Sequence, residues 1–202
     1  MSIDPSAIDG RSARAMRTRQ AIVDALIGLI EAGEVKPAAP RIAQRAGVSL
    51  RSIYQHFEDL EALFAAAHDR YTEVLLSEIT ELPVDRSFEE RLDGFVKQRT
   101  WVLERITPAR RAAALQEPFS DILRDGRDRM LQVARAEVAR LFKPELERFD
   151  PAERTEILAA TDMVSTWAAW DTLRTAGLDL DTATRVMRRA LAAILHGANE
   201  GD

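Results

Sequence analysis

Cysteine is absent from the 202 residues of this chain. The chain can therefore form no disulfide, and it offers neither a thiol nucleophile nor a cysteine-ligated metal site. Only three histidines occur, and no apolar run reaches the roughly 18–20 residues of a membrane-spanning helix. The first ten residues lack the basic stretch and apolar core of a signal peptide. We therefore expect a cytoplasmic protein that does not interact with membranes.

Patterns that carry catalytic or cofactor chemistry are also missing. The chain has no His-x-x-His or Glu-x-x-His pair for a metal, no glycine-rich phosphate loop and no Gly-x-Ser-x-Gly turn for a serine nucleophile. We expect no catalytic residue, no cofactor and no metal, and an all-helical enzyme is only a remote alternative.

Charge is distributed unevenly along the chain. In total, 28 Lys and Arg stand against 33 Asp and Glu, a formal net charge of −5, which by itself argues against binding a polyanion. Residues 11–57, however, contain eight basic and three acidic side chains, a net charge of +5. Such a local excess of positive charge is what a phosphate-binding surface requires.

The segment Arg41–Phe57, inside this positive region, has the pattern of two short helices joined by a tight turn. Ala43 is small enough to let the helices cross closely, and Ile53 fills the angle between them. Gly47 stands where the turn requires a positive φ, which glycine adopts without strain. Ser49 is a good N-cap for the second helix. In a helix-turn-helix, the N-terminal part of the second helix contacts base edges in the major groove.

These residues resemble the TetR family of bacterial transcriptional regulators. The motif Ile-Ala-x-x-Ala-Gly-Val-Ser begins at Ile42, Ile-Tyr-x-His-Phe ends at Phe57, and Glu-Ala-Leu follows at residues 61–63. The similarity covers residues 14–72. It implies an all-α fold of about nine helices, with an N-terminal helix-turn-helix DNA-binding domain and a C-terminal helical domain for ligand binding and dimerisation. The simplest alternative is a helical hairpin that only packs.

The resemblance also predicts the domain organisation. We expect a flexible N-terminal tail over residues 1–13, the DNA-binding domain over residues 14–72, and the effector-binding and dimerisation domain over residues 73–202. The boundary lies within a predicted helix from Leu60 to about Glu81, so it is not a flexible linker.

The DNA-contacting residues implied by the resemblance lie on the second helix of the motif and at the start of the first. The candidates are Arg41, Ser49, Leu50, Arg51, Ser52, Tyr54, Gln55 and His56. His56 is expected to contact phosphate, with a structural cap as its alternative role.

The chain departs from the family pattern at three places. Leu60 stands where a phosphate-binding lysine is common, and Ala38–Pro40 occupy the place of a hydroxyl residue. Arg51 replaces a small residue. We infer that phosphate contacts are redistributed to Arg41 and Arg51.

The rest of the chain shows helical periodicity with local start and stop signals. Ser87 and Glu90 form a capping box that begins one helix, and Thr107-Pro108 is expected to begin another. A capping pair at Asp150 and Glu153 predicts a helix that runs to Gly177. Asp181 is expected to cap the last helix, which ends near Gly197.

Apolar residues on the last two predicted helices suggest a dimer interface. The helix over residues 151–176 has two apolar faces, formed by Ile157, Ala160, Val164 and Ala168 and by Met163, Trp167 and Trp170. A helix that is apolar on more than one side must bury both sides. We expect a homodimer built on these two helices that binds a palindromic operator in double-stranded DNA. Burial of both faces in one monomer is the alternative.

A small-molecule effector is implied by the resemblance rather than by any sharp motif. The candidate lining is apolar, although such residues more often form plain core: Phe95, Phe119, Met130, Met163, Trp167 and Trp170. Arg99 lies at the centre of an apolar stripe, where an unpaired charge is costly. Its partner is expected to be Asp162, Asp171 or an anionic effector. The leading hypothesis is a repressor that a mainly apolar effector releases from DNA, and the alternative is an effector-independent or activating regulator.

Overall fold

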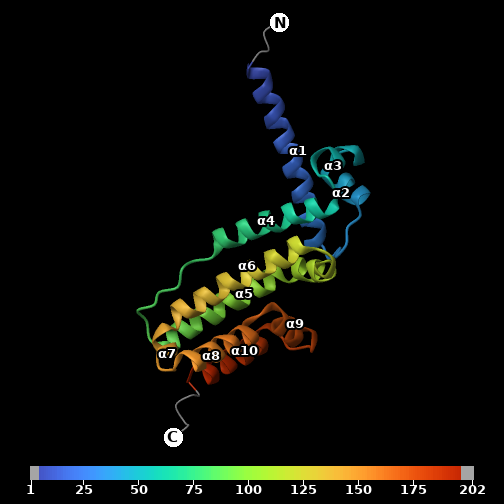
Figure 1. Ribbon diagram of the computed structural model, residues 1–202. Coiled ribbons are helices and arrows are strands. Elements are labelled where there is room, and N and C mark those ends of the chain that lie inside the picture. The colour runs from blue at the N-terminus through green and yellow to red at the C-terminus, as the bar shows by residue number, and fades with distance from the viewer. Residues whose placement is uncertain (1–4, 197–202) are drawn as a thin grey trace. The chain divides into compact units, whose positions relative to one another are not determined.

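The computed structural model of the chain describes residues 5–196, with side chains from residue 12 onward. Ten α-helices and one short 3-10 helix follow one another in this range, which contains no strand (Figure 1). The all-α prediction is therefore confirmed. The helices are α1 (Pro5–Glu31), α2 (Ala39–Ala46), α3 (Leu50–His56), α4 (Leu60–Glu78), α5 (Phe88–Ala114), η1 (Glu117–Phe119), α6 (Asp121–Leu141), α7 (Lys143–Leu146), α8 (Pro151–Ser165), α9 (Trp167–Thr175) and α10 (Leu180–His196).

The helices form two compact units. The first unit comprises residues 1–77 and 108–124, and the second comprises residues 78–107 and 125–202. Helices α5 and α6 each contribute residues to both units. The first unit therefore extends slightly beyond the segment 14–72 and adds a second stretch of chain that local patterns do not assign to it.

Apolar faces of four helices meet in the core of the first unit. Ile22, Leu26 and Leu29 come from α1, Ile42 from α2, Ile53 from α3 and Leu63 from α4, and each is at most 1% exposed. Their spacing on α1 follows the helical period, so one stripe of that helix faces the others. This core fixes α3, whose opposite face remains exposed.

The second unit has its own core and a buried ion pair that the sequence did not reveal. Phe95, Phe142, Trp170 and Leu191 are among its buried residues. Arg91 on α5 forms two hydrogen bonds with Glu145 on α7, of 2.6 Å (Nη2–Oε1) and 2.9 Å (Nη1–Oε2). The two residues are only 5% and 3% exposed.

The structure corrects four local predictions. The expected tail is helical from Pro5 onward, because α1 begins there; residues 1–4 lie outside the described range. Helix α5 continues through Pro108 instead of restarting there. The helix expected to reach Gly177 breaks at Thr166, whose backbone is extended and whose side chain caps α9. Asp179, rather than Asp181, accepts a hydrogen bond of 2.7 Å from the N–H of Thr182 at the start of α10.

Within the described range, no helix combines the length and apolarity needed to cross a lipid bilayer.

Candidate nucleic-acid interface

The turn between α2 and α3 has the geometry that the sequence predicts. Gly47 has φ 67° and ψ 30°, in the left-handed region. No heavy atom lies within 4 Å of a Cβ added there, so only the backbone conformation requires glycine. Ser49 accepts a hydrogen bond of 3.2 Å from the N–H of Ser52 and caps α3. Local chemistry therefore sets the angle at which α3 leaves the turn.

Helix α3 buries one side and presents the other to solvent. Ile53 is fully buried, whereas Leu50 is 43% exposed and Tyr54 53% exposed. Arg51 and Gln55 are exposed as well, and Ser52 and His56 are half-buried. The α3 candidates thus combine an arginine, an amide and an aromatic ring on a helix held by its opposite face. That combination suits hydrogen bonds to base edges and phosphates.

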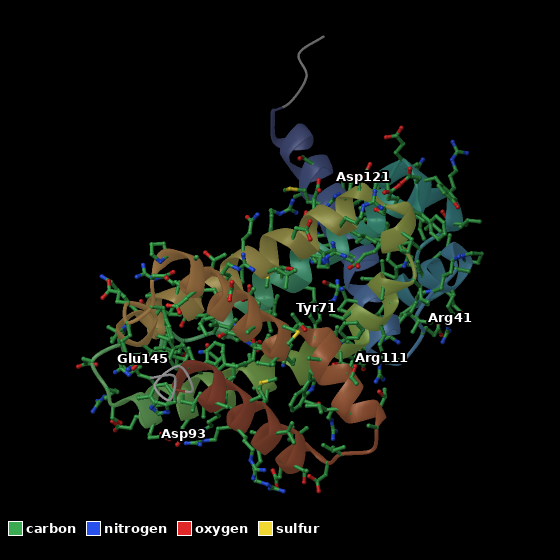
Figure 2. The ribbon with its side chains drawn as sticks, turned by 60° about the horizontal axis from the view of Figure 1, so that its bottom comes forward. Arg41, Tyr71, Asp93, Arg111, Asp121 and Glu145 are labelled. Atoms are coloured by element: carbon green, nitrogen blue, oxygen red, sulfur yellow. The ribbon has the colours of Figure 1, made fainter. Side chains whose placement is uncertain are left out.

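Arg41 lies at the start of α2 in the same unit and is drawn in Figure 2. Its Nε donates to Glu34 Oε1 at 3.0 Å, and its Nη1 donates to Gln44 Oε1 at 3.2 Å. Both partners of the ion pair are substantially exposed, and such pairs contribute only about 0–1 kcal/mol. A phosphate can therefore compete with Glu34 for this guanidinium.

Two hydroxyl groups at the start of α3 already have partners. Ser49 Oγ and Ser52 Oγ are 2.9 Å apart and share a hydrogen bond, in addition to the cap. Ser49 thus positions the helix through its own side chain.

The surroundings of Leu60 account for one departure from the family pattern. It is half-buried and packs against the core of the first unit. The capping role at the start of α4 belongs to Asp59, whose Oδ1 accepts from the N–H of Ala62 at 2.8 Å. A side chain at position 60 therefore serves packing in this chain.

Sequence reasoning missed two contacts that α1 makes with other parts of the first unit. The guanidinium carbon of Arg19 on α1 lies 4.7 Å from the centroid of the Phe57 ring, which ends α3. Arg45 on α2 lies over Gly28 of α1, where an added Cβ would meet Arg45 Nη2 at 2.6 Å. Neither contact follows a local motif, because each joins helices that are separated in the sequence.

The structure brings only part of the predicted effector lining together, since Phe95, Trp167 and Trp170 belong to one core. Phe95 and Trp170 are buried in the core of the second unit, whereas Phe119 is 88% exposed on η1 and Met163 is 66% exposed on α8. Phe119 also belongs to the first unit. Trp167 is half-buried and donates from Nε1 to Thr107 Oγ1 at 3.2 Å, and Met130 is half-buried.

The second unit does contain an unusual cation at Arg99. Its guanidinium carbon lies 4.9 Å from the centroid of the Phe95 ring. Burial lowers the pKa of this guanidinium, and the charges of Glu137 and Asp162 oppose that shift. Asp162 instead pairs with Arg135, so the predicted Arg99–Asp162 ion pair is not formed. In the part of the chain described, no carboxylate pairs with Arg99 within 4.0 Å.

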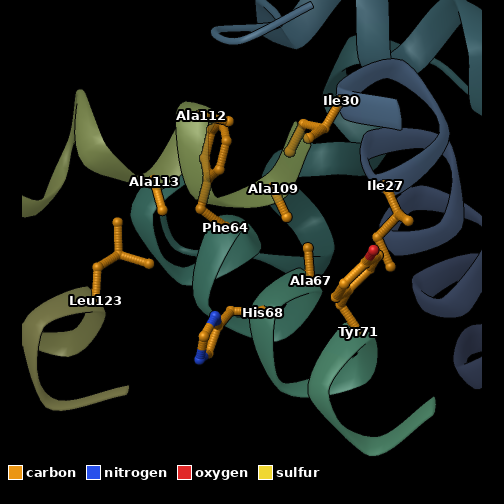
Figure 3. Close-up of a pocket in the computed structure, with 10 residues that line it drawn as sticks. All are labelled: Ile27, Ile30, Phe64, Ala67, His68, Tyr71, Ala109, Ala112, Ala113 and Leu123. Atoms are coloured by element: carbon orange, nitrogen blue, oxygen red, sulfur yellow. The ribbon is translucent and has the colours of Figure 1, made fainter. Parts of the chain in front are cut away.

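A pocket lies in the first unit and is lined partly by residues of the segment expected to hold one, residues 73–202 (Figure 3). It holds about 450 Å³ of atom-free space, part of it open to solvent. Its walls come from α1, α4, the end of α5 and the start of α6. The lining residues are Ile27, Ile30, Phe64, Ala67, His68, Tyr71, Ala109, Ala112, Ala113 and Leu123.

Among the described side chains, no group of three or more potential ligands is placed to hold a metal ion.

A capped helix-turn-helix with an exposed polar face, in the positively charged part of an all-helical chain, defines a DNA-binding protein. Residues 22–67 match the family of bacterial regulatory proteins described as the tetR family. The helix-turn-helix segment thus has the sequence pattern of the DNA-binding domain of that family.

Solved structures with a similar fold carry related descriptions. A transcriptional regulator from Rhodococcus sp. Rha1 has 18% sequence identity and a TM-score of 0.63, over 91% of this chain and 96% of that one. A proposed transcriptional regulator from Pseudomonas aeruginosa PAO1 has 17% identity and a TM-score of 0.61, over 89% of this chain and 91% of that one. These likenesses establish the fold. No curated protein sequence matches the chain.

Proposed function

We propose that the chain is a repressor that binds a palindromic operator as a homodimer and is released by a small, mainly apolar effector. The observation that carries the DNA-binding part is the exposed face of α3, where Arg51, Tyr54 and Gln55 stand on a helix whose other side is fixed by Ile53. Arg41 at the start of α2 supplies a further phosphate contact.

Binding to DNA upstream of the chain's own gene tests this proposal. Fluorescence anisotropy should show tighter binding to that duplex than to a random duplex of equal length. The site should be roughly palindromic, with half-sites about 34–36 Å apart or somewhat more. Equal affinity for both duplexes would argue against sequence-specific regulation. Transcript levels in a deletion strain then separate the alternatives, because loss of a repressor raises transcription and loss of an activator lowers it.

The dimer proposal rests on two apolar stripes of α10. Ala183, Met187, Leu191 and Leu195 form one stripe and are buried in the second unit. Val186, Ala190, Ala193 and Ile194 form a neighbouring stripe that is only partly covered or exposed. On α8, Met163 is also exposed. A second copy of the chain would cover this apolar surface and place two α3 helices on one operator.

A charge placed in the outer stripe tests the dimer. Val186 is 40% exposed, so Val186→Glu should leave the monomer folded and prevent association. Val133→Glu is the matched control, because Val133 is 52% exposed on α6. Sedimentation at micromolar concentration should show a monomer for Val186→Glu and a dimer for the control and the wild type. A monomeric wild type, with and without DNA, contradicts the dimer.

The effector proposal rests on Arg99, a half-buried guanidinium stacked on Phe95. The two carboxylates whose charges act on Arg99 already bind other arginines, since Glu137 pairs with Arg140 and Asp162 with Arg135. Arg99 therefore has donors available for an anionic group, at the edge of the apolar core that contains Phe95. We infer an effector with an aromatic or aliphatic body and one acidic group.

A panel of aromatic carboxylates, with the corresponding alcohols as neutral controls, tests this inference. An effector lowers operator affinity if it binds more tightly to the conformation of the dimer whose α3 helices are wrongly spaced for the operator. A coupling free energy of about 1–3 kcal/mol between effector and DNA corresponds to a loss of about 5–150-fold in affinity. Arg99→Met should stay folded and bind the operator but no longer respond to the carboxylate. A normal response in this variant removes Arg99 from the effector site. DNA release by no compound in the panel favours an effector-independent regulator.

A further inference from the structure

The N-terminal turns of α1 extend beyond the core of the first unit. The helix begins at Pro5, and among its described side chains, from residue 12 onward, the first buried one is Ile22. Figure 1 shows these turns continuing past α3 without another helix of the unit covering them. Met16 in this stretch is 65% exposed. An isolated stretch of helix this short is only marginally stable in water, so a binding partner would stabilise it.

The same turns carry positive charge only. Four arginines and no acidic residue lie between Asp9 and Asp24, at positions 11, 14, 17 and 19. Arg14 and Arg17 are exposed. They stand three residues apart, so their side chains leave neighbouring positions of the helix surface. No carboxylate pairs with either of them in the described part of the chain.

Other arginines at the protein surface differ from Arg14 and Arg17 because they pair with carboxylates. Arg70 on α4 pairs with Glu73 three residues later, at 3.2 Å. Arg188 on α10 pairs with Asp93 on α5. A helix surface that is only solvated usually mixes both signs in this way. The exposed turns of α1 have the composition of a surface that meets a polyanion.

These turns begin beside a contact with the end of α3: the guanidinium carbon of Arg19 lies 4.7 Å from the centroid of the Phe57 ring. Phe57 is the residue that ends α3. Helix α1 therefore passes the end of the proposed recognition helix at Arg19. At a rise of 1.5 Å per residue, the Cα atoms of Arg17 and Arg14 lie about 3 Å and 7.5 Å further along the axis. The positive turns are thus continuous with the surface of α3.

We propose that residues 12–19 of α1 bind the phosphate backbone of the DNA that flanks the site contacted by α3. Arg14 and Arg17 supply the contacts, and the guanidinium group suits bidentate binding of phosphate. The contacts are independent of sequence, and they lengthen the footprint beyond the helix-turn-helix. This inference rests on the proposed DNA-binding function.

The salt dependence of DNA binding tests the proposal. In the full chain, Arg14→Ala/Arg17→Ala removes two phosphate contacts and keeps good helix formers at both positions. The slope of log K against log salt concentration should become shallower by about 1.8. Between 50 and 200 mM salt, the wild type should therefore lose about 12-fold more affinity than the variant. Preference for the operator over a random duplex should stay unchanged, because phosphate contacts do not read bases.

Two further variants serve as controls. Lys97→Ala/Arg129→Ala removes two exposed positive charges from the second unit, and it should leave the slope within about 0.5 of the wild type. Arg14→Lys/Arg17→Lys keeps the charge and should retain most of the slope.

A failure of the proposed DNA-binding function can be distinguished from a failure of the proposed role of α1. If the wild type binds no duplex, the proposed function fails. If the wild type binds and Arg14→Ala/Arg17→Ala has its full slope, the role of α1 is overturned while the proposed function stands. If the double variant instead changes the sedimentation of the free protein, these turns contact a second copy of the chain, and the proposal is also overturned.

Discussion

The helix-turn-helix of the first unit and the ion pairs of the second unit depend on polar contacts of different sequence range. In the helix-turn-helix of the first unit, such contacts join residues close in the sequence, as between Ser49 and Ser52, three residues apart. In the second unit, local caps are accompanied by ion pairs between distant residues: Arg91 and Glu145 are 54 positions apart, and Arg188 and Asp93 are 95 apart. Glu145 and Asp93 are drawn in Figure 2. The helix-turn-helix of the first unit can therefore be predicted from local motifs, whereas the ion pairs of the second unit cannot.

The buried ion pair of the second unit gives the largest expected effect. Glu145→Ala leaves Arg91 buried without its carboxylate, so the free energy of unfolding should fall by about 3–5 kcal/mol. All three tryptophans, Trp101, Trp167 and Trp170, belong to the second unit. Urea unfolding followed by tryptophan fluorescence therefore reports on that unit.

Glu147→Ala is the matched control for this substitution. Its carboxylate lies 3.6 Å from the ammonium group of Lys143, and both side chains are exposed. An exposed pair contributes about 0–1 kcal/mol. Equal losses in Glu145→Ala and Glu147→Ala would show that the buried pair does not dominate the second unit.

Acid should weaken the same ion pair. Burial opposes ionisation of Glu145, but hydrogen bonds and charge attraction from Arg91 lower the pKa of Glu145 below its ordinary value. The folded-state pKa is thus depressed. The resulting stability is fully present above the unfolded pKa of about 4.3 and is lost as pH falls through the folded-state pKa.

Glu145→Gln removes this titration and serves as the comparison. The stability gap between the wild type and Glu145→Gln should narrow as pH is lowered from about 5 to 3. Glu90 and Asp179 also have lowered pKa values, each set mainly by the hydrogen bonds of a helix cap, and they titrate in both proteins. A gap that does not change with pH would contradict the role of Glu145.

Local signals predicted most of the first unit because their partners lie within a few residues. Gly47 and Ser49 have the predicted turn and cap geometry. The capping boxes of Ser87 with Glu90 and of Asp150 with Glu153 are also confirmed. Each is a contact that the helix end itself requires. The exposure of Arg51, Tyr54 and Gln55 follows from the burial of Ile53 on the other side of α3.

The features that sequence reasoning missed depend on distant contacts. Proline inside a helix costs about 3 kcal/mol, yet α5 continues through Pro108, between Ile106 and Ala109, which each pack against a core. Arg91 and Glu145 carry no local signature as a pair. Phe119 and Met163 fit an apolar lining by residue type alone, but their exposure depends on where helix ends lie in the fold.

Substitutions on α3 should impair DNA binding without affecting the second unit. Arg51→Ala should cost about 1–3 kcal/mol of operator affinity at one base position if Arg51 binds a guanine. If Arg51 contacts only phosphate, the loss should be equal for all sequences. Tyr54→Ala should weaken binding as well, and neither change should alter the tryptophan-detected unfolding transition.

Arg70→Ala is the matched control within the first unit, because Arg70 lies on α4 and pairs with Glu73. Anisotropy titrations with operator variants at each base position distinguish the two roles of Arg51. Unchanged affinity in both Arg51→Ala and Tyr54→Ala would show that α3 does not carry the recognition surface.

Substitutions at Ser49 give the smallest expected effect. They distinguish the role of Ser49 in positioning α3 from the contacts that α3 makes with DNA. Ser49→Ala removes the cap of α3 and should cost about 1 kcal/mol. The loss should appear as faster amide hydrogen exchange in α3, since local opening there does not involve the tryptophan-bearing unit. Ser49→Asp keeps a capping oxygen, so exchange should stay near the wild-type rate. The new carboxylate should nevertheless weaken DNA binding by repelling phosphate. If Ser49→Asp instead binds DNA as tightly as the wild type, the start of α3 does not approach the DNA backbone.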